Sequence, residues 1–273
     1  MPKTVGDSQR LLSVDDLSRP RILCLHGGGS NARIFRAQCR ILEKALCGHF
    51  RLVYADAPFL SQAGPCVLSV YANWGPYRRW LRWADHHPSV DALRATGAID
   101  EAVLSAVVRD DALGATGDWV GILGFSQGAK LAASLLFRQQ QRENNLAQRL
   151  ASTAVAIPSF RFGIFFAGRG PLVALDPDHA SSAGLPDAAA LSGADVNVNN
   201  WDESHVLRIP SIHVHGLKDP GIELHRYLRD VFCEKESTRL VEWNGDHRMP
   251  LKSKDVEAVV ESILSVAEHT GVF

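Results

Sequence analysis

The stretch WVGILGFSQGAKLAASLLF, residues 119–137, holds the pattern that decides the fold. An apolar run enters GFSQG at 124–128, and a long apolar segment of helical composition leaves it. A serine placed this way is typical of a nucleophile elbow, in which a sharp strand-to-helix turn exposes the hydroxyl. The pattern alone is weak, because a glycine-rich chain produces it by chance. A plain strand-to-helix turn remains the alternative until the partners of Ser126 are considered.

Short apolar runs alternate with longer helical patterns along the rest of the chain. Strands are expected at 21–27, 50–58, 118–125, 162–168, 209–216 and 238–245. Helices are expected at 31–46, 99–110, 127–141, 221–232 and 253–269. A series of strand, helix and strand builds a parallel sheet with right-handed crossovers. The sequence therefore predicts an α/β fold with a mostly parallel sheet of about six core strands flanked by helices.

Three segments fall outside this alternation. Residues 1–20 precede the first strand and are expected to form an N-terminal appendage to one domain, 21–273. The segment 58–97 is rich in Trp, Tyr, Pro and His, and the segment 169–207 is rich in Ala, Asp and Asn. Both follow strand ends, where ligand-binding loops emerge from an open α/β sheet. We expect these two segments to act as lids.

The composition excludes several classes of partner. A net charge of −1 in 273 residues gives no reason to expect nucleic acid or an anionic membrane. The N-terminal MPKTVGDSQR lacks the apolar core of a secretory signal, and no apolar run reaches the roughly 18 residues of a membrane helix. The five cysteines form no CxxC pair. We therefore expect a cytoplasmic protein with reduced thiols, and no metal or cofactor.

A serine nucleophile needs a base, and the base needs an orienting acid. In sheet hydrolases these partners follow in the order Ser, Asp or Glu, His. Asp219 comes just after the expected strand that ends at Gly216, and His247 comes after the last strand. All three residues thus fall at the carboxyl edge of the sheet. Ser126 would attack an acyl carbon, His247 would take and return its proton, and Asp219 would hold the imidazole.

Other acids and histidines compete for these roles. His213 and His215 lie within an expected strand, which indicates buried structural residues. His26 sits in the first turn after a strand, where its ring is expected to brace the turn. Asp246 is the first alternative to Asp219. The histidines of the lid segments remain open as pocket residues: His86, His87, His179 and His205.

The oxyanion of a tetrahedral intermediate needs backbone donors close to the serine. One is expected at the Gln127 N–H, at the start of the helix. The second is expected at the Gly28 N–H, in the glycine-rich LHGGGSN of residues 25–31. The alternative, a phosphate-binding loop, lacks both G-K-[ST] and a G-x-G-x-x-G with a following acid at the right spacing.

Five motifs carry a family resemblance: ILCLHGGGSNARIF, YADAP, GILGFSQGAKLA, SIHVHGLKDPGI and NGDHRMP. Together they resemble the fungal family of serine hydrolases, which includes the ovarian-cancer-associated esterase-like proteins of animals. The resemblance covers about residues 20–268. It implies an α/β-hydrolase fold with Ser126, Asp219 and His247 as the triad.

The HGGG loop resembles the branch of thioesterases encoded beside fungal polyketide synthases, such as the lovastatin-type releasing enzyme. This implies a serine acyl hydrolase that cleaves a thioester or ester of a polyketide-type acyl chain in secondary metabolism. An acyl carrier protein is then an expected partner. Two departures leave the substrate open. Ala57 stands where the family often has glycine in Asp-Gly-Pro, and Asp246 stands where it often has the second glycine of Gly-Gly-His.

The first lid segment carries a row of aromatic residues at three-residue spacing: Trp74, Tyr77, Trp80 and Trp83. On a helix they would form one aromatic face. Such a face suits the lining of an acyl pocket, because ligand pockets are mostly apolar and aromatic. The alternative is that it packs the lid onto the sheet. We hold both interpretations, since one stripe can do both.

Two sets of arginines could form a surface for a partner protein. Arg33, Arg36 and Arg40 share a face of the helix after the HGGG loop, and Arg78, Arg79 and Arg82 lie in the lid. Such a surface would attract an acidic carrier protein, although a solvated helix face is the commoner explanation. Two other functions stay open: a general short-chain carboxylesterase, and a hydrolase-fold protein that binds a small ligand without turnover.

Overall fold

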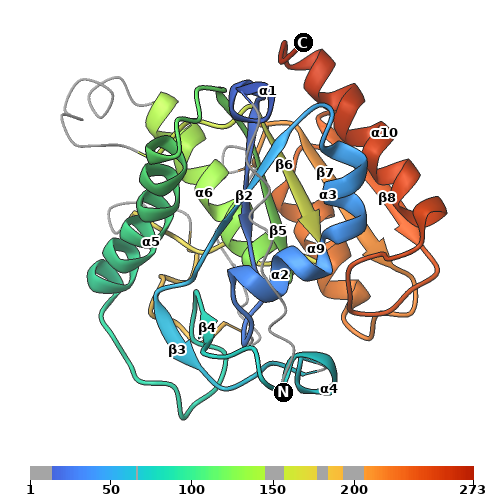
Figure 1. Cartoon of the computed structure of the whole chain (residues 1–273). Helices are drawn as coiled ribbons and strands as arrows, with labels where there is room; N and C mark the ends of the chain where they lie inside the picture. The colour runs from blue at the N-terminus through green and yellow to red at the C-terminus, as the bar shows by residue number, and fades with distance from the viewer. Residues whose placement is uncertain (1–13, 66, 145–156, 177–183, 193–205) are drawn as a thin grey trace, which may run out of the picture.

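The computed structural model describes residues 14–65, 67–144, 157–176, 184–192 and 206–273, and a six-stranded sheet runs through it (Figure 1). The strands are β1 (Arg21–Leu25), β2 (Arg51–Ala55), β5 (Trp119–Phe125), β6 (Phe162–Phe166), β7 (Ser211–Gly216) and β8 (Thr238–Trp243). They pair in the order β2-β1-β5-β6-β7-β8, and every pair is parallel. The predicted sheet is confirmed.

Burial explains why these runs are strands. Every residue of β1, β6 and β7 is buried, whereas the edge strands β2 and β8 are only partly buried. Continuous apolar runs are expected where helices cover both faces of a parallel sheet. The chain adds β2 on one side of β1 and β5 on the other. The carboxyl ends of β1 and β5 therefore meet at the switch point where open α/β sheets bind ligands.

Helices cover both faces of the sheet (Figure 1). One core cluster includes residues of α5 (Ala92–Ala112), α6 (Gln127–Asn144) and α9 (Ile222–Phe232). The other includes residues of α2 (Ala32–Gln38), α3 (Arg40–Leu46) and α10 (Ser253–His269). Two short helices, α1 (Val14–Ser18) and α4 (Leu68–Tyr71), complete the set within the described ranges. None of these helices is long and apolar enough to cross a lipid bilayer.

Two expected helices differ from the observed ones. The single helix expected over 31–46 is interrupted at Cys39, whose backbone has φ −82° and ψ 0°. The bend lets both halves bury apolar side chains, such as Phe35 and Leu46. The helix expected over 99–110 begins earlier, at Ala92. The Asp91 carboxylate accepts the Arg94 N–H there, which is an ordinary N-cap signal that apolar periodicity does not show.

The aromatic helix in the first lid segment is the main error. Tyr77 lies on β4 (Tyr77–Arg79), which pairs antiparallel with β3 (Phe59–Ser61). Trp80 follows this strand directly and is fully buried. Pro76 precedes β4, and proline disfavours helical backbone at the residue before it. The three-residue spacing therefore does not place the aromatic residues on one face.

Candidate active site

The elbow occupies one residue between β5 and α6. Ser126 has φ 54°, a left-handed conformation that a residue with a side chain rarely adopts. The two glycines permit it. A Cβ at Gly124 would overlap the backbone of Gly128, and a Cβ at Gly128 would overlap the Leu25 carbonyl of the neighbouring strand. The glycines on either side of the serine are thus required by the packing of α6 against the sheet.

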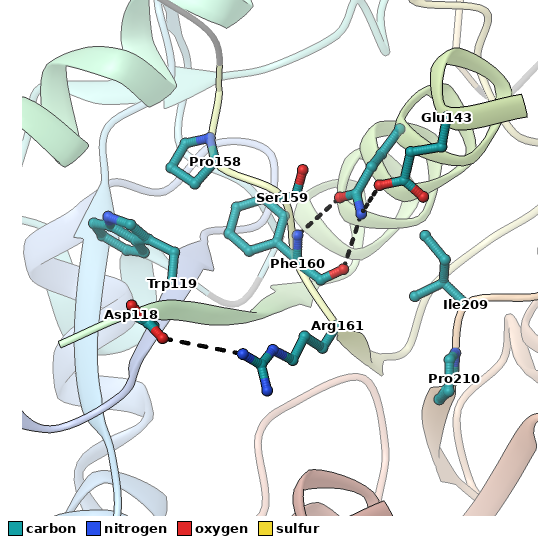
Figure 2. A pocket seen from close by; sticks show the side chains of 10 residues that line it. Asp118, Trp119, Glu143, Pro158, Ser159, Phe160, Arg161, Ile209 and Pro210 are labelled. Atoms are coloured by element: carbon teal, nitrogen blue, oxygen red, sulfur yellow. Dashed lines mark hydrogen bonds and ion pairs between the residues drawn. The ribbon is translucent and has the colours of Figure 1, made fainter. Parts of the chain in front are cut away.

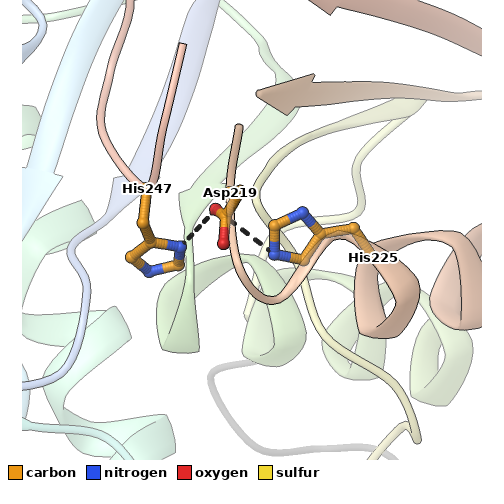
Figure 3. A group of neighbouring side chains, drawn as sticks. All are labelled: Asp219, His225 and His247. Carbon is orange, nitrogen blue, oxygen red and sulfur yellow. Dashed lines mark hydrogen bonds and ion pairs between the residues drawn. The ribbon is translucent and has the colours of Figure 1, made fainter. Parts of the chain in front are cut away.

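A chain of hydrogen bonds leads inward from Ser126. The Nε2 atom of His247 lies 2.9 Å from the Ser126 Oγ, and its Nδ1 lies 2.6 Å from Asp219 Oδ2. The other carboxylate oxygen accepts the Gly221 N–H at 2.8 Å. Figure 3 shows Asp219 beside His247. The fold therefore brings the three predicted residues into contact, although they come from three different loops.

Asp219 is the acid that contacts the imidazole. Its side chain is fully buried, and burial raises the pKa of its carboxyl. The hydrogen bonds from His247 and from the Gly221 N–H outweigh burial, so the pKa of Asp219 is held below its ordinary value. The alternative acid, Asp246, instead pairs with Arg248 at 2.8 Å. A carboxylate that stays ionised behind the imidazole can stabilise it as an imidazolium.

Sequence reasoning missed His225. It lies on α9, is fully buried, and its Nε2 lies 3.6 Å from Asp219 Oδ2 (Figure 3). Burial lowers the pKa of His225 to about 4, although the charge of Asp219 opposes this. The ligand atoms of Asp219, His225 and His247 lie within 4.8 Å of one another, so this group also has the spacing of a metal site. A histidine on the buried face of an amphipathic helix is the only sequence signal that points to it.

The other histidines considered in the sequence do not contact Ser126 or Asp219 within the described residues. His213 and His215 are buried in β7, and burial lowers the pKa of each ring. His26 is also buried, with Nδ1 2.8 Å from the Gly27 carbonyl and Nε2 accepting the Ala57 N–H at 3.0 Å. His26 thus joins the loop after β1 to the loop after β2. His86 is exposed and His87 is buried, while His179 and His205 lie outside the described residues.

The first loop and the start of α6 lie side by side. A Cβ at Gly28 would lie 3.3 Å from the side-chain oxygen of Gln127. Within the described ranges, neither the Gly28 N–H nor the Gln127 N–H donates a hydrogen bond. The Gln127 side chain is fully used, because it accepts the N–H groups of Trp80 and Leu81 and donates to the Leu81 carbonyl. It clamps the lid segment to the elbow.

The four predicted aromatic residues lie in different surroundings. Trp80 is in the core and donates its Nε1–H to the His26 carbonyl at 2.9 Å. Trp83 lies beside Gly28, since its Nε1 is 3.3 Å from the position of a Gly28 Cβ. Trp74 lies under the Arg33 guanidinium at 4.1 Å, and the Tyr77 hydroxyl donates to carbonyls of the α4 turn. Within this row, therefore, Trp80 packs in the core, whereas Trp83 lies beside the candidate site.

The predicted arginine surface is largely engaged within the chain. Arg36 pairs with Glu43 at 3.0 Å, and Arg40 donates to a helix carbonyl. In the lid, Arg78 donates to the Ala57 carbonyl, and Arg79 is buried. These contacts join α2 to α3, and the lid to the loop after β2.

A separate cavity of about 540 Å³ lies at the amino ends of the strands, opposite the end that carries Ser126 (Figure 2). It is lined by residues that precede β5, β6 and β7, including Asp118, Arg161 and Pro210. The Gln139 side chain in its lining bonds to the backbone of Phe160. Ligands of open α/β sheets bind at the carboxyl ends of strands, so this cavity is not the candidate active site.

The chain is similar to known proteins in sequence and in fold. The profile of the family described as "Serine hydrolase (FSH1)" matches residues 16–259. The chain is 54% identical over 257 residues to Esterase citA of Monascus ruber, covering 94% of this chain and 95% of that one. It is 50% identical over 269 residues to Esterase claE of Penicillium crustosum, covering 98% and 100%. A carboxylesterase structure from Bacillus cereus, 15% identical, superposes with a TM-score of 0.50 over 92% of this chain and 91% of that one, which supports the fold alone.

Proposed function

Because the chain belongs to the serine hydrolase (FSH1) family, we propose that it cleaves an acyl ester or thioester with a Ser126, His247 and Asp219 triad. Family membership makes the chain a hydrolase and an esterase in the broad sense. The triad itself is our proposal. The observation that carries it is the pair of contacts of one imidazole, 2.9 Å to the serine and 2.6 Å to the acid.

The first half of the reaction acylates the enzyme. The Ser126 Oγ attacks the acyl carbon while His247 Nε2 takes its proton, and Asp219 holds the imidazole through Nδ1. His247 then gives the proton to the leaving alcohol or thiol, and the acyl group stays on the serine. In the second half, water attacks the acyl carbon with His247 again as the base. The acid product leaves and Ser126 regains its proton.

The oxyanion of each tetrahedral intermediate needs preorganised donors. We propose the N–H groups of Gly28 and Gln127, which come from adjoining loops and donate no hydrogen bond within the part of the chain that the structure describes. Each donor of this kind typically contributes about 3 kcal/mol to transition-state stabilisation. His26 and the Gln127 side chain hold the two loops in place from behind.

For the substrate, we propose a thioester or ester of a polyketide-type acyl chain. The support is the resemblance of the HGGG loop to polyketide-releasing thioesterases, together with Trp83 beside Gly28. An acyl carrier protein is the carrier that this resemblance implies, and it is tested by comparing carrier-bound with pantetheine-bound acyl groups. A short-chain carboxylesterase remains the alternative, because the same catalytic groups serve both.

Two measurements test the proposal. A fluorophosphonate probe is expected to label the wild-type protein and the control Ser105→Ala, whose serine is exposed on α5, but not Ser126→Ala. The ratio kcat/KM is then measured for paired thioesters and esters from acetyl to decanoyl. Buried methylenes each add about 0.8 kcal/mol of binding, so the rate constant is expected to rise with acyl length. Labelling of Ser126→Ala would overturn the nucleophile assignment, and a preference for acetyl would favour the short-chain alternative.

A further inference from the structure

A buried lysine lies one turn beyond the nucleophile. Lys130 is 5% exposed, and its backbone N–H bonds to the Ser126 carbonyl at 3.1 Å. Side chains on a helix lean toward its N-terminus, and Ser126 directly precedes the N-terminus of α6. Its contact is a long hydrogen bond of 3.4 Å to the Ser192 Oγ. The Ser192 N–H in turn donates to the Arg82 carbonyl, next to the segment that Gln127 clamps.

This ammonium group has no acidic partner among the residues that the structure describes. Burial lowers the pKa of Lys130 to about 8, with a further contribution from the charge of Arg169. The group therefore stays largely protonated at neutral pH. An unpaired buried charge is costly, and proteins normally place an opposite charge beside it. The serine hydroxyl is a neutral acceptor and does not offset the charge.

A second cation lies in the loop after β6. Arg169 follows β6 at the same carboxyl edge, and its guanidinium packs over Gly221, where a Cβ would lie 2.7 Å from the nearest nitrogen. Its Nε is buried and has no hydrogen-bond partner in the described part of the chain. The charge of Arg169 contributes to the lowered pKa of both Lys130 and His225.

Asp219, the acid that binds the Gly221 N–H, is already occupied. Asp219 gives one oxygen to His247 and the other to the Gly221 N–H. Other arginines in the interior have their acids: Arg138 pairs with Asp100 at 2.7 Å, and Arg51 pairs with Asp110 at 2.6 Å. Within the described ranges, Arg138 and Arg51 are thus paired with carboxylates, whereas Lys130 and Arg169 are not.

We propose that Lys130 and Arg169 bind an anionic oxygen group of the substrate, so that the enzyme prefers acyl substrates that carry a negative charge. This rests on the proposed function and specifies its substrate class. A carboxylate on the acyl chain and a phosphate on a pantetheine leaving group share the required chemistry. Both offer two or more charged oxygens to an ammonium and a guanidinium.

The test compares charged and neutral substrates that differ in nothing else of consequence. One arm uses 4-nitrophenyl esters of glutaric and adipic acid, with one free carboxylate, against the pentanoate and hexanoate esters. The other arm uses octanoyl thioesters of 4′-phosphopantetheine and of pantetheine. The measured quantity is the ratio of kcat/KM for the charged member to that for the neutral member. We expect a ratio of at least about tenfold in one arm, which identifies the source of the anion.

Two variants test whether the preference for charged substrates depends on Lys130 and Arg169. Lys130→Met and Arg169→Met remove one charge each and keep most of the side-chain length. Each is expected to lower the ratio about tenfold, whereas Lys44→Met, an exposed lysine on α3, keeps the wild-type ratio. If one variant fails to fold, the other still reports on the site. Equal kcat/KM for charged and neutral members in both arms would overturn the anion site while leaving the esterase intact. No cleavage of any member, with no probe labelling, would instead overturn the proposed function.

Discussion

Acidification is expected to weaken the loop that carries Gly28, through His26. The neutral ring satisfies two groups at once, since Nδ1–H donates to the Gly27 carbonyl and Nε2 accepts the Ala57 N–H. A protonated ring has no acceptor, so the Ala57 N–H would face another donor. Burial lowers the pKa of His26 to about 4, against opposing contributions from the Gly27 carbonyl and from Asp56.

The sign of the effect follows from the two pKa values. A histidine in the unfolded chain has a pKa of about 6.5, which is above the folded value. As the pH falls, the unfolded chain therefore binds the proton first, and the folded state loses stability from about pH 6.5 down to about pH 4. With these values, His26 alone removes about 2 kcal/mol from the free energy of unfolding between pH 7.5 and pH 5.

The assay is urea unfolding at pH 7.5 and pH 5 for three proteins: wild type, His26→Asn and His49→Asn. The His26→Asn protein loses hydrogen bonds and is expected to be less stable at pH 7.5. Its further loss on acidification should be smaller than that of the wild type by about 2 kcal/mol. His49 is exposed, so its replacement should leave the wild-type acid loss in place. Equal losses for all three proteins would refute the reasoning.

Three further predictions concern the elbow and its supports. Asp219→Asn is expected to lower kcat for 4-nitrophenyl acetate by about 10⁴, because the imidazole loses its orienting acid, and near-normal kcat would move that role elsewhere. Gly128→Ala is expected to lower the melting temperature and the rate of probe labelling, because its Cβ overlaps the Leu25 carbonyl. The control Gly48→Ala meets no atom within 4 Å and should change neither. Trp80→Ala is expected to lower the free energy of unfolding in urea by about 3–5 kcal/mol, and a loss below 1 kcal/mol would contradict its core position.

Much of the fold was predictable because its signals are local. Apolar runs such as 162–166 are buried at every residue, so they stand out from the amphipathic helices without any knowledge of their neighbours. The order of Ser126, Asp219 and His247 along the chain was readable for the same reason. Each follows its own strand, and parallel strands bring their carboxyl ends to one edge. Helix starts such as Asp91 were missed because a cap is a single side-chain contact.

What the sequence by itself determined is therefore the sheet, the elbow and the three residues that meet at its edge. Only the tertiary structure decided which polar side chains are buried and which groups lie beside them. His225 behind Asp219, Trp80 in the core and Lys130 beside the elbow look like ordinary members of their segments. Their roles depend on distances between elements far apart in the chain. The pattern of residues along an element determines which of its faces is buried. The energy of a charge on that face depends instead on the groups of the neighbouring element that cover it.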